Sequence, residues 1–131
     1  MRLLALLLLV LAGIFGYYKI QEHRVVNRIA AQFQIMPSWE AIRNHLYSEI
    51  KPGMTREEVY KILDKVGPWE ILWYDDPNKD EGGWDPDTRQ FLFREHIRFT
   101  QKNTYHEMGF WGFLYDKNGK LVRQSPLDSG G

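Results

Sequence analysis

Side chains whose oxygen atoms could ligate a metal ion are concentrated between residues 75 and 87. Four of them stand at the first, third, fifth and twelfth positions of a calcium-binding loop: Asp76, Asn78, Asp80 and Asp87. Calcium is held by several oxygens at about 2.3–2.6 Å, which suits such a series. Glu81, however, occupies the sixth position, where the turn of that loop needs glycine. A calcium site and a solvated connector rich in turn-forming residues therefore both remain open interpretations.

Basic and aromatic side chains form a second group of candidates. Arg94, His96 and Arg98 alternate along a predicted strand, which places them on one side as a basic ladder for an acidic protein or a lipid headgroup. Aromatic residues make up 15% of the chain, more than one face of a small sheet buries. Exposed aromatic side chains favour protein or sugar contacts. The candidate partner-binding residues are Trp84, Arg94, His96, Arg98 and Trp111.

Several classes of function lack the residues they need. There is no cysteine, which removes disulfides, thiolate metal sites and a lipidated cysteine. We find no nucleophile paired with a base and no phosphate-binding loop, and we expect neither enzymatic activity nor a resident cofactor. Acidic residues outnumber basic ones after Met36, which disfavours nucleic acid as a partner. The histidines show no metal-ligand spacing: His23, His45, His96 and His106.

The N-terminal segment is apolar on every helical face. No charged side chain occurs from Leu3 to Tyr18, so this stretch predicts a membrane-spanning helix within residues 1–20. Tyr17 and Tyr18 stand where an interfacial aromatic belt would lie. A cleaved signal peptide is the alternative. We favour a retained signal anchor, because the best cleavage sequence falls inside the apolar run.

Local signals divide the rest of the chain. Apolar residues at helical spacing predict a juxtamembrane helical stalk over residues 21–37. The folded domain is expected over 38–124, followed by a flexible tail over 125–131. Ser38 is the predicted N-cap of one helix. Thr55 and Glu58 form a capping box for a second helix, which ends before Gly67.

After the second helix the apolar period changes to two. Strands are predicted over 69–74, over 91–99 and over 108–115, and Asn118-Gly119 predicts a final hairpin with a type I′ turn. Glu95 is the one charge on an apolar face, which suggests a bulge or an edge position there. The expected fold class is α+β, with two helices packed on a three- to four-stranded antiparallel sheet.

A short motif in this domain resembles a known family. The stretch Gly53-Met54-Thr55-Arg56-Glu57-Glu58-Val59, with Ile62-Leu63 and Gly67-Pro68, is similar to the SmpA/OmlA (BamE-like) outer-membrane assembly-factor domain, which is related in fold to β-lactamase inhibitory proteins. The likeness is specific only over about residues 53–68. It implies a two-helix, three-strand domain outside the cytoplasm that acts as a non-enzymatic scaffold. The chain departs from the pattern in lacking a lipidated cysteine and in its long acidic 75–87 loop.

These observations predict a single-pass membrane protein whose domain serves as an interaction or assembly module. The alternatives are a calcium- or carbohydrate-binding module using the 75–87 loop, and an inhibitor-like domain acting on a secreted or cell-wall enzyme. Lys19, Arg24 and Arg28 follow the apolar segment, and the positive-inside rule alone would place the domain in the cytoplasm. We expect it outside, because the resemblance implies that side.

Overall fold

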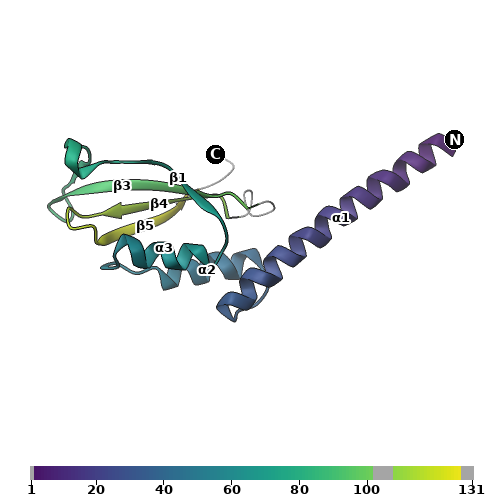
Figure 1. The fold of residues 1–131 in the computed structure, drawn as a ribbon, viewed down its shortest axis with the longest axis horizontal. Helices are drawn as coiled ribbons and strands as arrows, with labels where there is room; N and C mark the ends of the chain where they lie inside the picture. Colours follow the sequence, from purple (N-terminus) through teal and green to yellow (C-terminus); the bar gives the residue numbers. More distant parts are fainter. Residues whose placement is uncertain (1, 102–107, 128–131) are drawn as a thin grey trace.

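The computed structural model describes residues 2–101 and 108–127 and has the predicted α+β class. Its helices are α1 (Arg2–Phe33), α2 (Trp39–Glu49) and α3 (Arg56–Asp64), with a short 3-10 helix η1 (Pro77–Lys79). Its strands are β1 (Trp69–Tyr74), β2 (Gly83–Asp85), β3 (Gln90–Phe99), β4 (Phe110–Tyr115) and β5 (Leu121–Leu127). The helices α2 and α3 lie along one face of the sheet, and α1 projects away from it (Figure 1).

The sheet is antiparallel, with the strand order β1-β3-β4-β5. β3 pairs with β1 through Glu95–Phe99 and with β4 through Phe93–Arg98. The unpredicted strand β2 lies inside the acidic loop and pairs with the first part of β3, where Gly83 stands opposite Leu92. Its three residues are too few to show an alternating pattern in the sequence.

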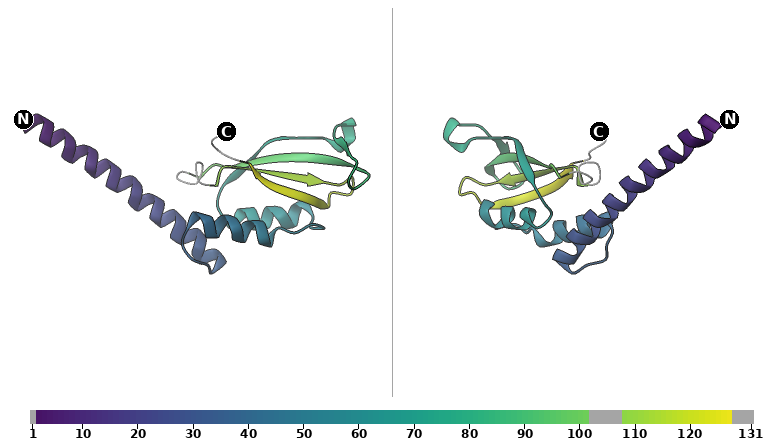
Figure 2. Two further views of the ribbon diagram at one scale, coloured as in Figure 1. Left: turned by 180° about the vertical axis from the view of Figure 1, so that it is seen from behind. Right: turned by 45° about the vertical axis from the view of Figure 1, so that its right-hand side comes forward.

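The helix α1 is a single element rather than an anchor followed by a separate stalk. Its first half is exposed and apolar, and the whole helix is long and apolar enough to cross a membrane. Its second half carries a buried stripe: Val25, Val26, Ile29, Ala30 and Phe33. Four of these side chains join the main core cluster, Ala30 being the exception. The segment predicted to be a stalk is therefore part of the domain, and the two further views in Figure 2 show its lower end beside α2.

Polar contacts also fix α1 to the domain. Arg28 Nη2 donates to Gln101 Oε1 at 2.6 Å and to the Val66 carbonyl at 3.2 Å. Near the start of α2, Trp39 Nε1 donates to Glu22 Oε1 at 3.1 Å. These bonds fix the second half of α1 to the segments that follow α3 and β3 and to the start of α2.

Both predicted N-caps are confirmed. Ser38 Oγ accepts from the Ala41 amide at 3.1 Å, and Thr55 Oγ1 accepts from the Glu58 amide at 3.2 Å. Each bond satisfies an amide that the first turn of a helix leaves without a partner. Thr55 also forms an isolated β-bridge with Lys120, so this cap joins α3 to the final hairpin.

Thr55→Ala is expected to lower the free energy of unfolding by about 0.5–2 kcal/mol, because it removes the capping oxygen. Thr55→Ser keeps that oxygen and should retain most of the stability. Chemical denaturation of the two variants measures the difference. Equal losses in both variants would assign the effect to the threonine methyl group rather than to the cap.

The final hairpin is confirmed, but its predicted turn type is wrong. A type I′ turn needs positive φ at both central residues, whereas Gly119 has φ 76° and Asn118 is not among the residues with positive φ. Asp116 Oδ1 instead accepts from the amides of Asn118 and Lys120, each at 2.9 Å. β5 then continues through Leu127, into the segment predicted to be tail, and residues 128–131 lie outside the described part.

Candidate functional site

The two faces of the sheet have different roles. The face toward the helices holds the largest buried side chains, among them Trp111, Phe113 and Tyr115. Trp111 is 0% exposed, and its Nε1 donates to Gln124 Oε1 at 3.1 Å. The prediction that Trp111 forms part of a partner-binding surface is therefore corrected, since the residue alternates on the same side as Phe113 and packs in the core.

We call the opposite side of the sheet the outer face. The strand register places on it Trp73 of β1, Arg94, His96 and Arg98 of β3, Gly112 and Leu114 of β4, and Arg123 of β5. The expected alignment of the three β3 residues is thus confirmed. Their use in binding a partner stays a prediction.

The arginines of the outer face are not free cations. Arg94 Nε lies 3.3 Å from Asp75 Oδ2, and Arg123 Nη2 lies 2.9 Å from Asp85 Oδ2. Arg98 is paired in the same way with the carboxylate of Glu70. Three ion pairs leave this face with little net charge, so a basic ladder is a poor description of it. The expected attraction for acidic partners is reduced accordingly.

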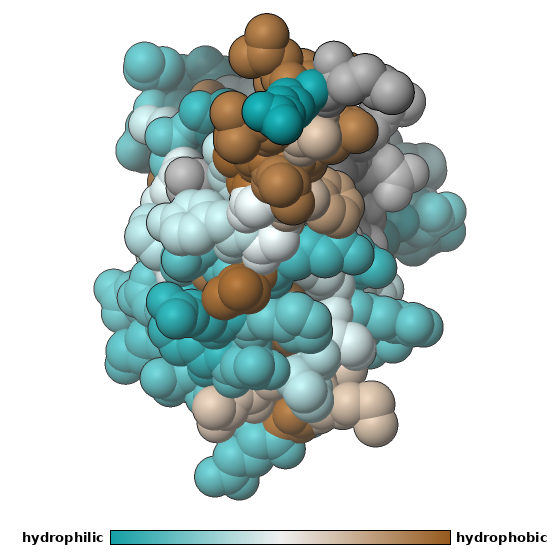
Figure 3. All heavy atoms as spheres, turned by 90° about the vertical axis from the view of Figure 1, so that its right-hand side faces the viewer, coloured by the Kyte–Doolittle hydropathy of each residue, from teal (hydrophilic) through white to brown (hydrophobic). Residues whose placement is uncertain are grey.

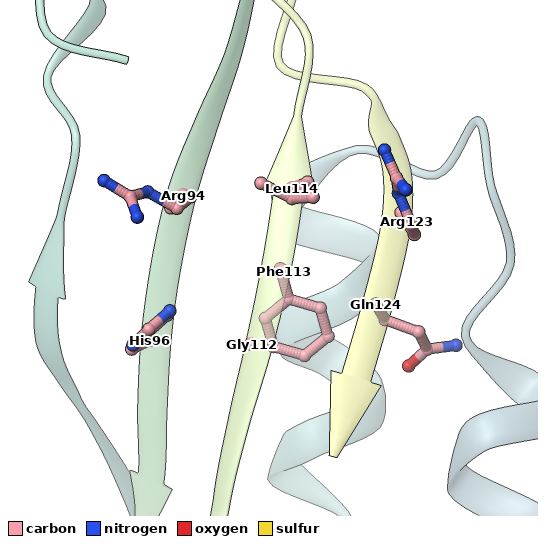
Figure 4. A pocket seen from close by; sticks show the side chains of 7 residues that line it. All are labelled: Arg94, His96, Gly112, Phe113, Leu114, Arg123 and Gln124. Carbon is pink, nitrogen blue, oxygen red and sulfur yellow. The ribbon is translucent and has the colours of Figure 1, made fainter. Parts of the chain in front are cut away.

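A hollow of about 170 Å³ lies over β4 on the outer face, where Gly112 contributes no side chain. Arg94 and His96 stand on its β3 side, with Leu114 and Arg123 at its upper end, as Figure 4 shows. A second hollow of about 340 Å³ extends it toward Trp84, Asp85 and Leu92, because both are lined by Arg94, Leu114 and Arg123. The outer face therefore carries one continuous depression.

The β1 side of this depression is aromatic. The His96 ring lies 4.3 Å from the Trp73 ring, and the Arg94 guanidinium carbon lies 5.1 Å from the centre of the same indole. Burial, and then the charge of Arg94, lower the pKa of His96 despite the opposing effect of Asp75. His96 is therefore neutral at pH 7 and offers one hydrogen-bond donor and one acceptor.

Trp84 lies at the other end of the depression, in β2. Its ring packs edge-on against Phe91 with 5.5 Å between the ring centres, and the side chains remain 57% and 55% exposed. Gly82 allows this close approach of the loop, since a Cβ there would come within 2.9 Å of both the Leu92 carbonyl and the Phe93 ring. The exposure expected for Trp84 is confirmed.

The acidic loop is held by hydrogen bonds between its own residues. Asp76 Oδ1 accepts from the Asn78 amide at 2.9 Å, which caps η1, and the Asp76 amide donates to Glu81 Oε2 at 2.6 Å. Asp80 adopts the left-handed conformation, and Asp87 follows β2 in the turn that leads to β3. No group of three or more His, Asp or Glu side chains in the described residues could hold a metal ion. The predicted calcium arrangement is therefore wrong, because β2 separates the ligands.

A buried polar cluster between α3 and the sheet was not predicted. Glu95 is 2% exposed on the helix side of β3, and Tyr60 Oη lies 2.9 Å from each of its carboxylate oxygens. Arg56 Nε lies 3.4 Å from Glu95 Oε2, and its guanidinium carbon is 4.6 Å from the centre of the Tyr115 ring. The expectation of an edge position or bulge at Glu95 is wrong: β3 is an inner strand, and the bulge falls in β1, between Ile71 and Trp73.

The protonation of this cluster follows from its burial. Desolvation raises the pKa of Glu95, although the Tyr60 hydrogen bond and the charge of Arg56 oppose the rise. Desolvation together with the nearby Glu95 carboxylate also raises the pKa of Tyr60, so Tyr60 stays protonated as a donor. The arrangement joins α3 to the centre of the sheet.

No protein-family model, no curated protein and no solved structure matches this chain. The features of the molecule that bear on its function are the exposed apolar half of α1 and the depression on the outer face.

Proposed function

We propose that the protein is a membrane-anchored, non-enzymatic interaction module. The observation that carries the proposal is that one helix contains both an exposed apolar segment and part of the domain core. The apolar side chains gather on the side where α1 projects, above a largely hydrophilic domain (Figure 3). Burying them in a bilayer is strongly favourable, at about 25 cal/mol for each Å² removed from water.

The outer face is the surface we assign to a protein partner. Its depression has an apolar floor and a rim of arginines and aromatic rings, the pattern of residues that dominates binding energy at interfaces. The paired carboxylates lower the net charge that a partner must neutralise. The face of the sheet toward the helices is buried in the core. The outer face is therefore the one on which a partner can bind the sheet.

The motif over residues 53–68 supports placing this partner in an envelope or membrane assembly, with the folded domain outside the cytoplasm. Protease treatment of intact cells expressing the full-length protein tests the orientation. Digestion of the domain without cell lysis is the expected result. Protection until the membrane is opened would place the domain in the cytoplasm.

Leu114→Asp is expected to reduce partner retention at least about tenfold, because it puts a charge on the floor of the depression. The new carboxylate would lie between Arg94 and Arg123, which should keep the variant folded. The measurement is a mild-detergent pull-down of full-length protein with quantitative mass spectrometry, and Lys117→Ala in the exposed β4–β5 turn is the matched control. Equal retention of a stoichiometric partner by Leu114→Asp and wild type would contradict the assignment of this face.

The same pull-down with residues 1–20 deleted separates the two parts of the proposal. A partner retained by both forms is bound by the folded domain. A partner lost with the apolar segment is bound within the membrane or held only by shared lipid.

A further inference from the structure

A cleft of about 320 Å³ lies between α1 and the start of α2, on a different part of the molecule from the outer face. Lys19, Glu22 and His23 line it from α1, and Ser38 and Trp39 line it from α2. Val26, which is 6% exposed, contributes to its apolar part. The cleft thus combines charged and polar groups with an apolar wall.

The position of the cleft along α1 matches the headgroup layer of a membrane. The uncharged stretch ends at Tyr18, one residue before the cleft begins. A bilayer of about 40–45 Å with a hydrocarbon core of about 30 Å leaves about 5–7 Å of headgroups on each side. At about 1.5 Å per residue, that depth corresponds to roughly three to five helical residues, which counted from Lys19 extends to about His23.

The cleft also offers separate charges of both signs. The Lys19 ammonium lies 5.3 Å from the centre of the Phe15 ring, and among the described residues it has no carboxylate within 4.0 Å. Glu22 lies one turn further along α1 and receives one bond, from Trp39 Nε1 to its Oε1 at 3.1 Å. Lys19 and Glu22 thus face the same cleft without forming an ion pair with each other. Such a site suits a ligand that carries both a negative and a positive charge.

We propose that this cleft binds the phosphoethanolamine headgroup of a phospholipid. Lys19 would meet the phosphate, with His23 and Ser38 as further donors, and the carboxylate of Glu22 would accept from the ligand ammonium group. A choline headgroup has no N–H to donate to Glu22, and a phosphoglycerol headgroup brings no cation to it. This proposal rests on the proposed membrane anchoring, and it adds the class of lipid that the cleft recognises.

The test uses full-length protein in mild detergent with equal amounts of dioleoyl phosphatidylethanolamine and dioleoyl phosphatidylcholine, and native mass spectrometry measures the lipid retained. The expected result is one retained lipid per protein, with the ethanolamine form preferred at least about fivefold. Glu22→Gln should abolish the preference, and Lys19→Gln should lower retention of both lipids. Arg24→Gln, on α1 but outside the cleft lining, is the matched control and should behave as wild type.

Glu22→Gln distinguishes recognition from packing, because its amide oxygen can still accept from Trp39 Nε1 while the negative charge is lost. An ethanolamine preference in Glu22→Gln equal to that of wild type would overturn the proposal. Co-sedimentation with phosphatidylcholine vesicles separates the two proposals. Failure to co-sediment overturns both the anchor and the cleft, whereas co-sedimentation without any preference for the ethanolamine lipid overturns the cleft alone.

Discussion

Replacing Ile29 with alanine is expected to lower the free energy of unfolding by about 2–5 kcal/mol. Ile29 is 0% exposed and belongs to the same core cluster as Ile42 and Leu46 of α2. Truncating it removes apolar contacts and leaves a cavity that the surrounding helices only partly fill. An effect of this size in a segment predicted to be a stalk would show that the domain includes the second half of α1.

Urea denaturation of the full-length protein in mild detergent, followed by tryptophan fluorescence, measures this loss. Asn27→Ala is the matched control, since Asn27 is exposed on the same helix and should change stability by less than about 0.5 kcal/mol. If Ile29→Ala were as mild as the control, α1 would be packed only loosely on the domain in solution.

Tyr60→Phe is the second variant with a large expected effect, a loss of about 1.5–3 kcal/mol at neutral pH. It removes a hydrogen bond to the buried carboxylate of Glu95 while keeping the ring that packs 4.7 Å from Trp69. The carboxylate would then depend on Arg56 alone. Tyr47→Phe, at a tyrosine with a 51% exposed side chain, is the control and should change little.

The same cluster predicts how stability depends on pH. The pKa of Glu95 is raised by folding from its ordinary value of 4.5, so the folded state favours the protonated carboxyl. The stability contributed by that preference is fully present below the unfolded pKa and is lost as pH rises through the folded pKa. Glu95→Gln cannot lose stability in this way. Its free energy of unfolding should therefore rise relative to that of wild type as pH increases from the unfolded pKa of Glu95 through its folded pKa. A constant difference between the two proteins from acid to neutral pH would show that the pKa of Glu95 is not raised.

Local signals accounted for much of the fold. Thr55 caps the start of α3, and Gly67 follows its end with a positive φ that favours glycine. Both signals depend on residues that are close in sequence. The strands β1, β3 and β4 followed from alternation. Alternation also puts Trp111 on the same side of β4 as Phe113, and both side chains are buried. The burial of Ile29 could not be predicted in this way, because an apolar stripe on a helix does not reveal which partner covers it.

The candidate site was less predictable, because it depends on contacts between distant segments. Alternation put Arg94 and His96 on one side of a strand, as the structure has them. The carboxylates that neutralise the arginines come from Asp75 and Asp85, and the latter lies in a strand too short to recognise. The hollow depends on the register that brings Gly112 opposite His96. Neither relation can be read from local sequence.

The uninterrupted course of α1 has a mechanical consequence. At about 1.5 Å per residue its 32 residues form a rod of roughly 48 Å, and its inner end is part of the core. With its apolar half in a bilayer, as proposed, this helix would couple its own tilt directly to the orientation of the domain. Any tilt of the rod relative to the membrane would turn the whole domain through the same angle. The direction of the outer face would then follow the tilt of α1, so a change in that tilt would change the angle at which a membrane partner meets this face.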